Sequence, residues 1–236
     1  MPEIDIEGEK LEYSIRRSEK ASKPRIDSKL EGIRVVIPEG SDLDPEKLLE
    51  NRSEWVREKY REKRDFLDSI EEKDFVEREE FLYRGDKIQL LTEQEESEIT
   101  EQNIKTKASE PRDVEEEVRK LYRKQAKEIF SQHVDKYSER IDGEFNEIQV
   151  RNQRTRWGSC TAKNNLSFNW RIIMAPEFVS EYLVVHELVH LEHSDHSQKF
   201  WKRVKELFPR YEESEKWLDN NQNRLALTKN DIMKSN

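Results

Sequence analysis

The sequence predicts an α+β fold in which a small strand-rich N-terminal region with a long helix precedes a second domain of helices and mixed strands. Two observations predict this class. Short alternating or β-branched apolar segments dominate the first forty residues, whereas apolar residues in the second half recur mainly at three- and four-residue spacing. A chain of 236 residues is long enough for one large domain or two small ones.

Two strands and a helix are predicted in the N-terminal region. Residues 10–18 (KLEYSIRRS) alternate apolar and polar side chains, and residues 32–38 (GIRVVIP) are β-branched between a glycine and a proline. Asp44 and Pro45 then give the signal of a helix start, as N-cap and first helical residue. Sparse apolar residues follow as far as residue 70, which predicts a long helix that is largely solvated.

A hairpin and a linker are predicted next. The segment FLYRGDKIQLL is typical of a hairpin with Gly-Asp, residues 85–86, in its turn. Residues 92–109 hold almost no apolar side chains, which predicts a loop or linker. We therefore expect the domain boundary there, with an N-terminal region over residues 1–105 and a second domain over residues 106–236.

Helices dominate the expected second domain. Residues 111–137 have the spacing of an amphipathic helix, and residues 176–193 that of a buried helix that Ser194-Asp195 ends. New helices are predicted from Ser197 and from Tyr211, and the polar tail past Leu227 is expected to fray.

A polar strand face is predicted in front of the buried helix. A strand near residues 148–150 leads into a Gly-Ser turn. The segment LSFNWRII then alternates, so that its apolar residues face the core and Ser167, Asn169 and Arg171 lie on an available polar face.

Charge and composition restrict the partners that we expect. The net charge of -9 argues against general nucleic-acid binding, because a phosphate polymer is repelled at long range. No apolar run is long enough to cross a bilayer and the first residues lack a signal-peptide core, so we expect a cytoplasmic protein without a membrane partner. Cys160 is the single cysteine, so a metal would have to be bound by histidine and carboxylate. No oligomeric state is indicated.

Four of the five histidines lie in HELVHLEHSDH, residues 186–196. His186 and His190 are about 40° apart around a helix, so both imidazoles can bind one cation. Glu187 follows the first histidine, where its carboxylate can take a proton from water at the metal. This H-E-x-x-H arrangement predicts one zinc ion per chain, with Glu187 as the catalytic base.

A catalytic zinc site needs a third protein ligand and one open position. If the helix continued to His193, the three histidines would span roughly 10 Å of its axis, too far to meet one ion. The chain must therefore turn back first. His196 follows the Ser194-Asp195 break and is the predicted third ligand, whereas Asp195 is a weaker candidate because its carboxylate can instead cap a helix.

Several segments resemble one known family. RTRWGSC, LSFNWRIIMAP and VVHELVHLEHSDHSQKFW are similar to segments of the YgjP-like metal-dependent hydrolases, relatives of the SprT-like and WLM zinc metallopeptidases. RRSEKASKPRI and GIRVVIPEG extend the resemblance towards the N-terminus. It implies a zincin-like catalytic domain in which a mixed sheet covers the active-site helix. It also implies that His186, His190 and His196 bind zinc and that Glu187 is the catalytic base.

The first functional hypothesis is a zinc metallopeptidase that acts on a peptide or protein substrate. Zinc lowers the pKa of water to about 7, and Glu187 removes the proton. The polar strand face is predicted to bind the substrate backbone as an added strand, with Asn169 or Arg171 near the scissile bond. Arg156 and Trp157, the latter as a pocket wall, complete the expected substrate-binding residues.

Two alternatives use the same metal. A phosphohydrolase acting on nucleotides would bind phosphate through nearby guanidinium groups, although arginines in a glutamate-rich chain are also typical of surface ion pairs; these arginines are Arg151, Arg154, Arg156 and Arg171. A binding module with a structural zinc would require a fourth protein ligand, for which His193 or Asp195 is available.

Overall fold

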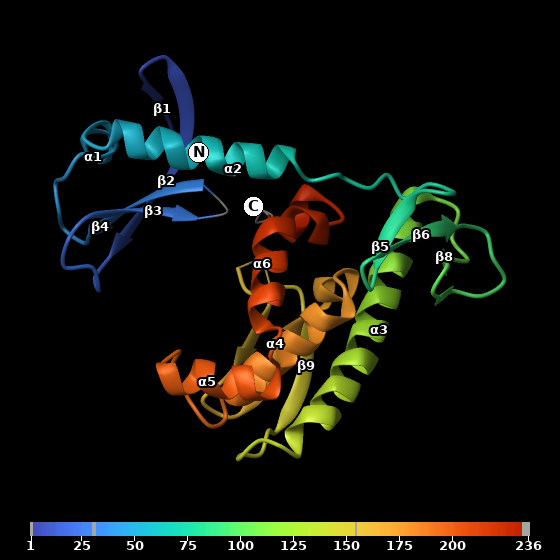
Figure 1. The fold of residues 1–236 in the computed structure, drawn as a ribbon. Helices are drawn as coiled ribbons and strands as arrows, with labels where there is room; N and C mark the ends of the chain where they lie inside the picture. The colour runs from blue at the N-terminus through green and yellow to red at the C-terminus, as the bar shows by residue number, and fades with distance from the viewer. Residues whose placement is uncertain (1, 30–31, 154, 233–236) are drawn as a thin grey trace. The chain divides into compact units, whose positions relative to one another are not determined.

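The chain forms two compact units. A computed structural model describes nearly the whole chain, over residues 2–29, 32–153 and 155–232. Unit 1 consists of the residues up to Glu71 and of the C-terminal segment that begins at Thr228. Unit 2 consists of residues 72–227. The boundary expected near residue 105 therefore falls inside unit 2. Helices and mixed sheets occur together in the chain, which confirms the α+β class (Figure 1).

Unit 1 is built on a four-stranded sheet in the order β1-β2-β4-β3. Its central strands β2 and β4 are parallel, and each outer strand is antiparallel to its neighbour. The strands are β1 (Glu3–Ile6), β2 (Glu9–Ser18), β3 (Arg25–Lys29) and β4 (Gly32–Pro38). The two strands predicted in this region are confirmed as β2 and β4.

The long helix predicted after the sheet is interrupted, and it consists of α1 (Pro45–Glu50) and α2 (Ser53–Asp68). Asp44 caps α1 as expected, since its side chain accepts a hydrogen bond from a first-turn amide at 3.0 Å. Arg52 separates the helices because its backbone, at φ -131° and ψ 32°, is not helical. Leu49 and Val56 anchor the two helices in the core of unit 1.

The C-terminal residues that the structure describes fold into unit 1, so the prediction of a frayed tail is wrong for them. Thr228 forms a capping box at the start of the short 3-10 helix η3 (Lys229–Asp231). Lys229 pairs with Asp68 at 3.3 Å, and Ile232 is buried. The apolar side chain and the ion pair hold this segment in place.

Unit 2 begins with a four-stranded sheet in the order β5-β6-β8-β7. The predicted hairpin is confirmed, but its turn is Arg84-Gly85, whose φ angles of 51° and 94° suit a two-residue type I′ turn. The expected linker, residues 92–109, instead contributes two strands because Ile104 is fully buried and pairs with β6. The strands are β5 (Glu80–Tyr83), β6 (Asp86–Leu91), β7 (Glu98–Ile99) and β8 (Asn103–Lys105).

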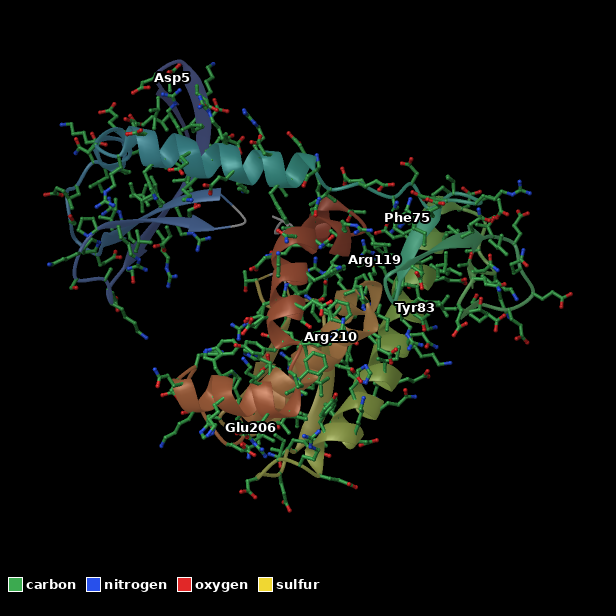
Figure 2. The ribbon with its side chains drawn as sticks, viewed as in Figure 1. Asp5, Phe75, Tyr83, Arg119, Glu206 and Arg210 are labelled. Carbon is green, nitrogen blue, oxygen red and sulfur yellow. The ribbon has the colours of Figure 1, made fainter. Side chains whose placement is uncertain are left out.

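The helix predicted over residues 111–137 is confirmed as α3 (Pro111–Ser138). Its apolar stripe packs against β9, α4 and the 3-10 helix η1 (Trp170–Met174). Tyr83 of β5 extends towards α3, where its hydroxyl donates to Gln125 at 3.2 Å (Figure 2). The long helix therefore connects the first sheet of unit 2 to the elements around α4.

A three-stranded sheet in the order β10-β11-β9 lies before α4 in the sequence. Its strands are β9 (Glu147–Arg151), β10 (Gly158–Cys160) and β11 (Asn165–Asn169). The central strand β11 pairs on both edges, antiparallel to β10 and parallel to β9. Its polar residues Ser167 and Asn169 are buried. The polar face that we expected to be available is therefore in the interior.

Three helices complete unit 2, namely α4 (Glu177–Val189), α5 (Gln198–Leu207) and α6 (Tyr211–Asn221), followed by the 3-10 helix η2 (Gln222–Leu225). α4 contacts α3, α5, α6 and β10. It is apolar nearly all round, as expected of a helix that neighbours enclose. Within the described ranges, no helix has the length and apolar character that a membrane span requires.

Candidate metal centre

The first two histidines lie at the C-terminal end of α4. His186 is in its last turn and His190 is the C-cap, whose backbone remains helical at φ -65° and ψ -16°. The two rings therefore lie on one side of the helix, as predicted, with centroids 5.1 Å apart. The helix ends at Val189, earlier than the break expected at Ser194-Asp195.

A turn after α4 brings His196 back to this pair. The amides of Leu191 and His193 bond to carbonyls of the last helical turn, which closes the turn. Asp195 accepts a hydrogen bond from the Ser197 amide at 3.1 Å. Asp195 is thus used to shape the approach to α5, and it is not in the metal-ligand cluster that the described residues form.

The three imidazoles fit a tetrahedral zinc ion. Ligand nitrogens of His186, His190 and His196 lie within 4.8 Å of one another, and the Nε2 atoms of His186 and His196 are 3.1 Å apart. Two nitrogens bound to a tetrahedral zinc at about 2.0–2.1 Å are roughly 3.3 Å apart. The observed separation is close to this value, and three ligands leave one vertex for water or substrate.

Phe200 supports all three rings from one side. This residue of α5 is fully buried, and its ring centroid lies 4.9, 4.6 and 4.8 Å from those of His186, His190 and His196. Trp201 contacts the first and third rings, with its ring centroid 5.8 Å from each. The aromatic start of α5 therefore restricts the orientation of the histidines.

Hydrogen bonds at Nδ1 of His186 and His190 leave the Nε2 atoms of these two rings free for a metal. His190 Nδ1 lies 3.0 Å from the His193 carbonyl oxygen, so it carries the proton and donates. His186 Nδ1 lies 3.3 Å from the Tyr182 hydroxyl oxygen, and this hydroxyl donates to Glu215 at 3.0 Å. His193 thus contributes its carbonyl, whereas Tyr182 and Glu215 connect α6 to His186.

The protonation states suit this arrangement. Burial, followed by the neighbouring imidazoles, lowers the pKa of His186 to about 3, so its ring is neutral at physiological pH. Burial also lowers the pKa of His190. Burial and the Glu215 carboxylate raise the pKa of Tyr182, so its hydroxyl stays protonated and donates. Neutral imidazole is the form that binds a metal.

Tyr182→Phe should weaken metal affinity by about 10- to 100-fold, the usual cost of removing an outer hydrogen-bond partner of a metal-binding histidine. Competition with a chelator measures this affinity directly. Tyr83→Phe is a matched control, because it also removes one hydroxyl hydrogen bond, to Gln125 on α3. Equal affinities in Tyr182→Phe and the wild type would show that the Tyr182–Glu215 pair does not orient His186.

Glu187 is held against β10. Its side chain is almost fully buried, and a Cβ atom added to Gly158 would lie 2.5 Å from its Oε1. Only a glycine allows the strand to approach this closely. Burial raises the pKa of Glu187 to about 8 in the metal-free protein, while a hydrogen bond from the Cys160 amide and the charge of Arg156 act in the opposite direction.

The four predicted substrate-binding residues separate into two pairs. Asn169 and Arg171 are 0% and 1% exposed, so the expectation that they line an open strand face is wrong. Arg171 donates to the carbonyls of Gln153 and Leu225, at 3.0 and 3.2 Å, and Asn169 also donates to the Gln153 carbonyl. Both therefore hold loops together.

Arg156 and Trp157 remain accessible beside β10. Arg156 is exposed, and Trp157 is half-buried, with the Arg171 guanidinium 5.0 Å from its ring centroid. Of the other described arginines of the phosphate hypothesis, only Arg171 approaches this position, and it is buried and bonded to loop carbonyls. Arg151 lies on β9, at the opposite edge of the sheet from β10, and Arg154 lies outside the described residues.

Comparisons with known proteins give one family. The model described as YgjP-like, metallopeptidase domain, matches residues 23–221. No curated protein matches the chain. Two solved metallopeptidase zymogens have 21% identity and cover 41% of this chain: abylysin of Pyrococcus abyssi (95% of its chain, TM-score 0.34) and jannalysin of Methanocaldococcus jannaschii (96%, TM-score 0.35).

Proposed function

Because this chain belongs to the YgjP-like metallopeptidase family, we propose that it hydrolyses peptide bonds with one zinc ion per chain. The proposed ligands are His186, His190 and His196, and the proposed catalytic base is Glu187. The observation that carries the proposal is the convergence of three imidazole nitrogens within 4.8 Å, next to the buried carboxylate of Glu187, against which Gly158 of β10 packs.

When bound, zinc supplies a Lewis acid that polarises a carbonyl and lowers the pKa of water. A carboxylate oxygen of Glu187 takes the proton from the attacking water and then delivers it to the leaving amine nitrogen. The Cys160 amide and Arg156 favour the ionised form that this step requires, and a nearby cation acts in the same direction. Tyr182 keeps His186 oriented throughout.

We place the substrate backbone along β10. Among the described residues β10 pairs with β11 alone, and it contacts α4, whose Glu187 accepts the hydrogen bond of the Cys160 amide. An extended peptide can add to an edge strand through main-chain hydrogen bonds. β11 is unsuitable because both of its edges are paired. Arg156 and Trp157, which directly precede β10, are the side chains that we expect to contact the substrate.

The two alternatives have less support. A nucleotide phosphohydrolase would use arginines that, as far as the structure describes them, are distributed over both sheet edges and the core, with Arg171 bonded to carbonyl oxygens. A structural zinc would need a fourth protein ligand, whereas the cluster that the described residues form contains three histidines. We therefore favour the open catalytic site.

Elemental analysis combined with a mixed substrate panel tests the proposal. We expect one zinc per chain, cleavage of unfolded proteins and peptides, and no release of phosphate from nucleotides. Treatment with a chelator should remove the metal and the cleavage together, and added zinc should restore both. Phosphate release without peptide cleavage would select the phosphohydrolase, and stoichiometric zinc without any hydrolysis would select the structural site.

A further inference from the structure

A groove between α3 and β9 has the opposite charge to the chain as a whole. We call it the basic groove, and its lining residues are Arg123, Lys124, Lys127, Ile148, Gln149, Val150 and Arg151. Four of these side chains are positive and none is a carboxylate, although the net charge of the chain is -9. α3 and β9 lie side by side along this surface (Figure 1).

The three groove cations of α3 are available to a ligand, whereas Arg151 donates to the Gln149 side chain. The ion pairs on α3 lie on either side of it, where Arg119 pairs with Glu115 at 2.8 Å and Lys136 pairs with Glu181. Figure 2 labels Arg119, which lies on α3 just beyond the basic groove, towards the end of that helix nearer β5. The groove cations of α3 are exposed, and within the described residues none of them forms an ion pair.

The floor of the groove is a free strand edge. Within the part of the chain that the structure describes, β9 pairs only with β11, through a parallel ladder from Glu147 to Arg151. Along such an edge strand, alternate amides and carbonyls point away from the partner. Among the described residues, no backbone hydrogen bond reaches the amides and carbonyls on the outer edge of β9. An added strand would therefore gain main-chain hydrogen bonds beside a row of cations.

We propose that the basic groove binds an extended acidic peptide segment, which adds to β9 as a strand and places its carboxylates against the groove cations. A peptide fits better than a nucleic acid because a phosphate chain has no amides to complete a strand ladder.

The inference extends the proposed peptidase function, on which it rests, by naming a class of substrate. β9 and β10 lie on opposite sides of β11, so their backbones are about two strand spacings, or roughly 10 Å, apart. The groove would therefore bind a part of the substrate remote from the scissile bond. Proteins with an acidic extended segment would be captured in preference to neutral ones.

Fluorescence anisotropy with a labelled peptide of alternating Glu and Thr tests the inference. The Glu187→Gln background prevents cleavage, and zinc content is measured separately. The combined charge reversal Arg123→Glu, Lys124→Glu and Lys127→Glu should weaken binding by roughly tenfold or more, since three exposed ion pairs are lost. A matched reversal on unit 1, Arg16→Glu with Lys20→Glu and Lys23→Glu, changes the net charge equally and should leave Kd within about twofold.

Backbone methylation separates strand addition from simple charge attraction. Two peptides carry N-methyl groups on alternate residues, one set in each register, and only the set that faces β9 should lose binding. If folding fails in the charge reversal, the neutral variant with Arg123→Gln, Lys124→Gln and Lys127→Gln replaces it, with a smaller expected loss.

Three results would overturn the inference. They are equal Kd values for the groove variant and the wild type, equal binding of both methylated peptides, and tighter binding of single-stranded DNA than of an acidic peptide of the same charge. These results are distinguishable from failure of the peptidase proposal, which would appear as absent cleavage or absent zinc while peptide binding to the groove persists.

Discussion

Glu187→Gln is expected to retain one zinc per chain and to lose about 10³-fold in kcat, within the range that a general base contributes. The amide has nearly the shape of the carboxylate and fits beside Gly158, but it cannot accept a proton from water. The histidine ligands and their hydrogen-bond partners are unchanged. Steady-state peptide hydrolysis and zinc content, measured on the same preparation, check both parts of this expectation.

Glu177→Gln is the matched control for this variant. Glu177 begins the same helix, but it is exposed and pairs with Arg84 at 2.6 Å. An exposed ion pair contributes little to stability, so the kcat of Glu177→Gln should equal that of the wild type. Wild-type turnover in Glu187→Gln would assign the proton transfer to another group, and loss of zinc would give Glu187 a structural role.

Gly158→Ala is expected to lower kcat by roughly 10²-fold while the zinc content stays the same. The added methyl carbon would lie 2.5 Å from Oε1 of Glu187 and 2.9 Å from its carboxyl carbon, so the side chain must move. A displacement of about 1 Å in a catalytic group can cost roughly 10²-fold in rate. Peptide hydrolysis and metal analysis together distinguish this displacement from loss of the ion.

Ser159→Ala in the same strand provides the comparison for the glycine variant. It introduces no atom beyond the side chain that is already present, so β10 keeps its distance from α4. We expect nearly full activity in this variant. Wild-type kcat in Gly158→Ala would mean that the contact between β10 and Glu187 does not position the base.

Local patterns in the sequence predicted the convergence of the three histidines because its signals are close together in the chain. His186 and His190 are one helical turn apart. A straight helix cannot bring three histidines to one ion, and this limit indicated His196 as the third ligand. The structure brings these three rings together. The position of the turn was less accurate, since α4 ends at Val189 and Ser194-Asp195 only completes the reversal.

The outer contacts of the site depend on residues that no local pattern connects. Tyr182 shares a helix face with His186, which is a readable signal, but its partner Glu215 comes from α6. Phe200 comes from α5, and its contact with all three imidazoles follows only from the packing of that helix. Such contacts require the tertiary structure.

Alternation misled the prediction of the substrate face. The pattern from Leu166 to Ile172 is that of a strand with one polar side, but β11 is central in its sheet and ends at Asn169. Asn169 and Arg171 are buried because they bond to loop carbonyls. The expected linker was misread because its composition is polar, whereas residues 103–105 pair with β6 and Ile104 and Thr106 are buried.

The identity of the third ligand is tested most directly by the zinc affinity of two histidine variants, His196→Ala and His193→Ala, measured by chelator competition. We expect His196→Ala to lose at least about 10²-fold in affinity, because one of three metal bonds is removed. His193→Ala should bind like the wild type, since His193 contributes its backbone carbonyl. Unchanged zinc affinity in His196→Ala, or a large loss in His193→Ala alone, would contradict a site formed by His186, His190 and His196.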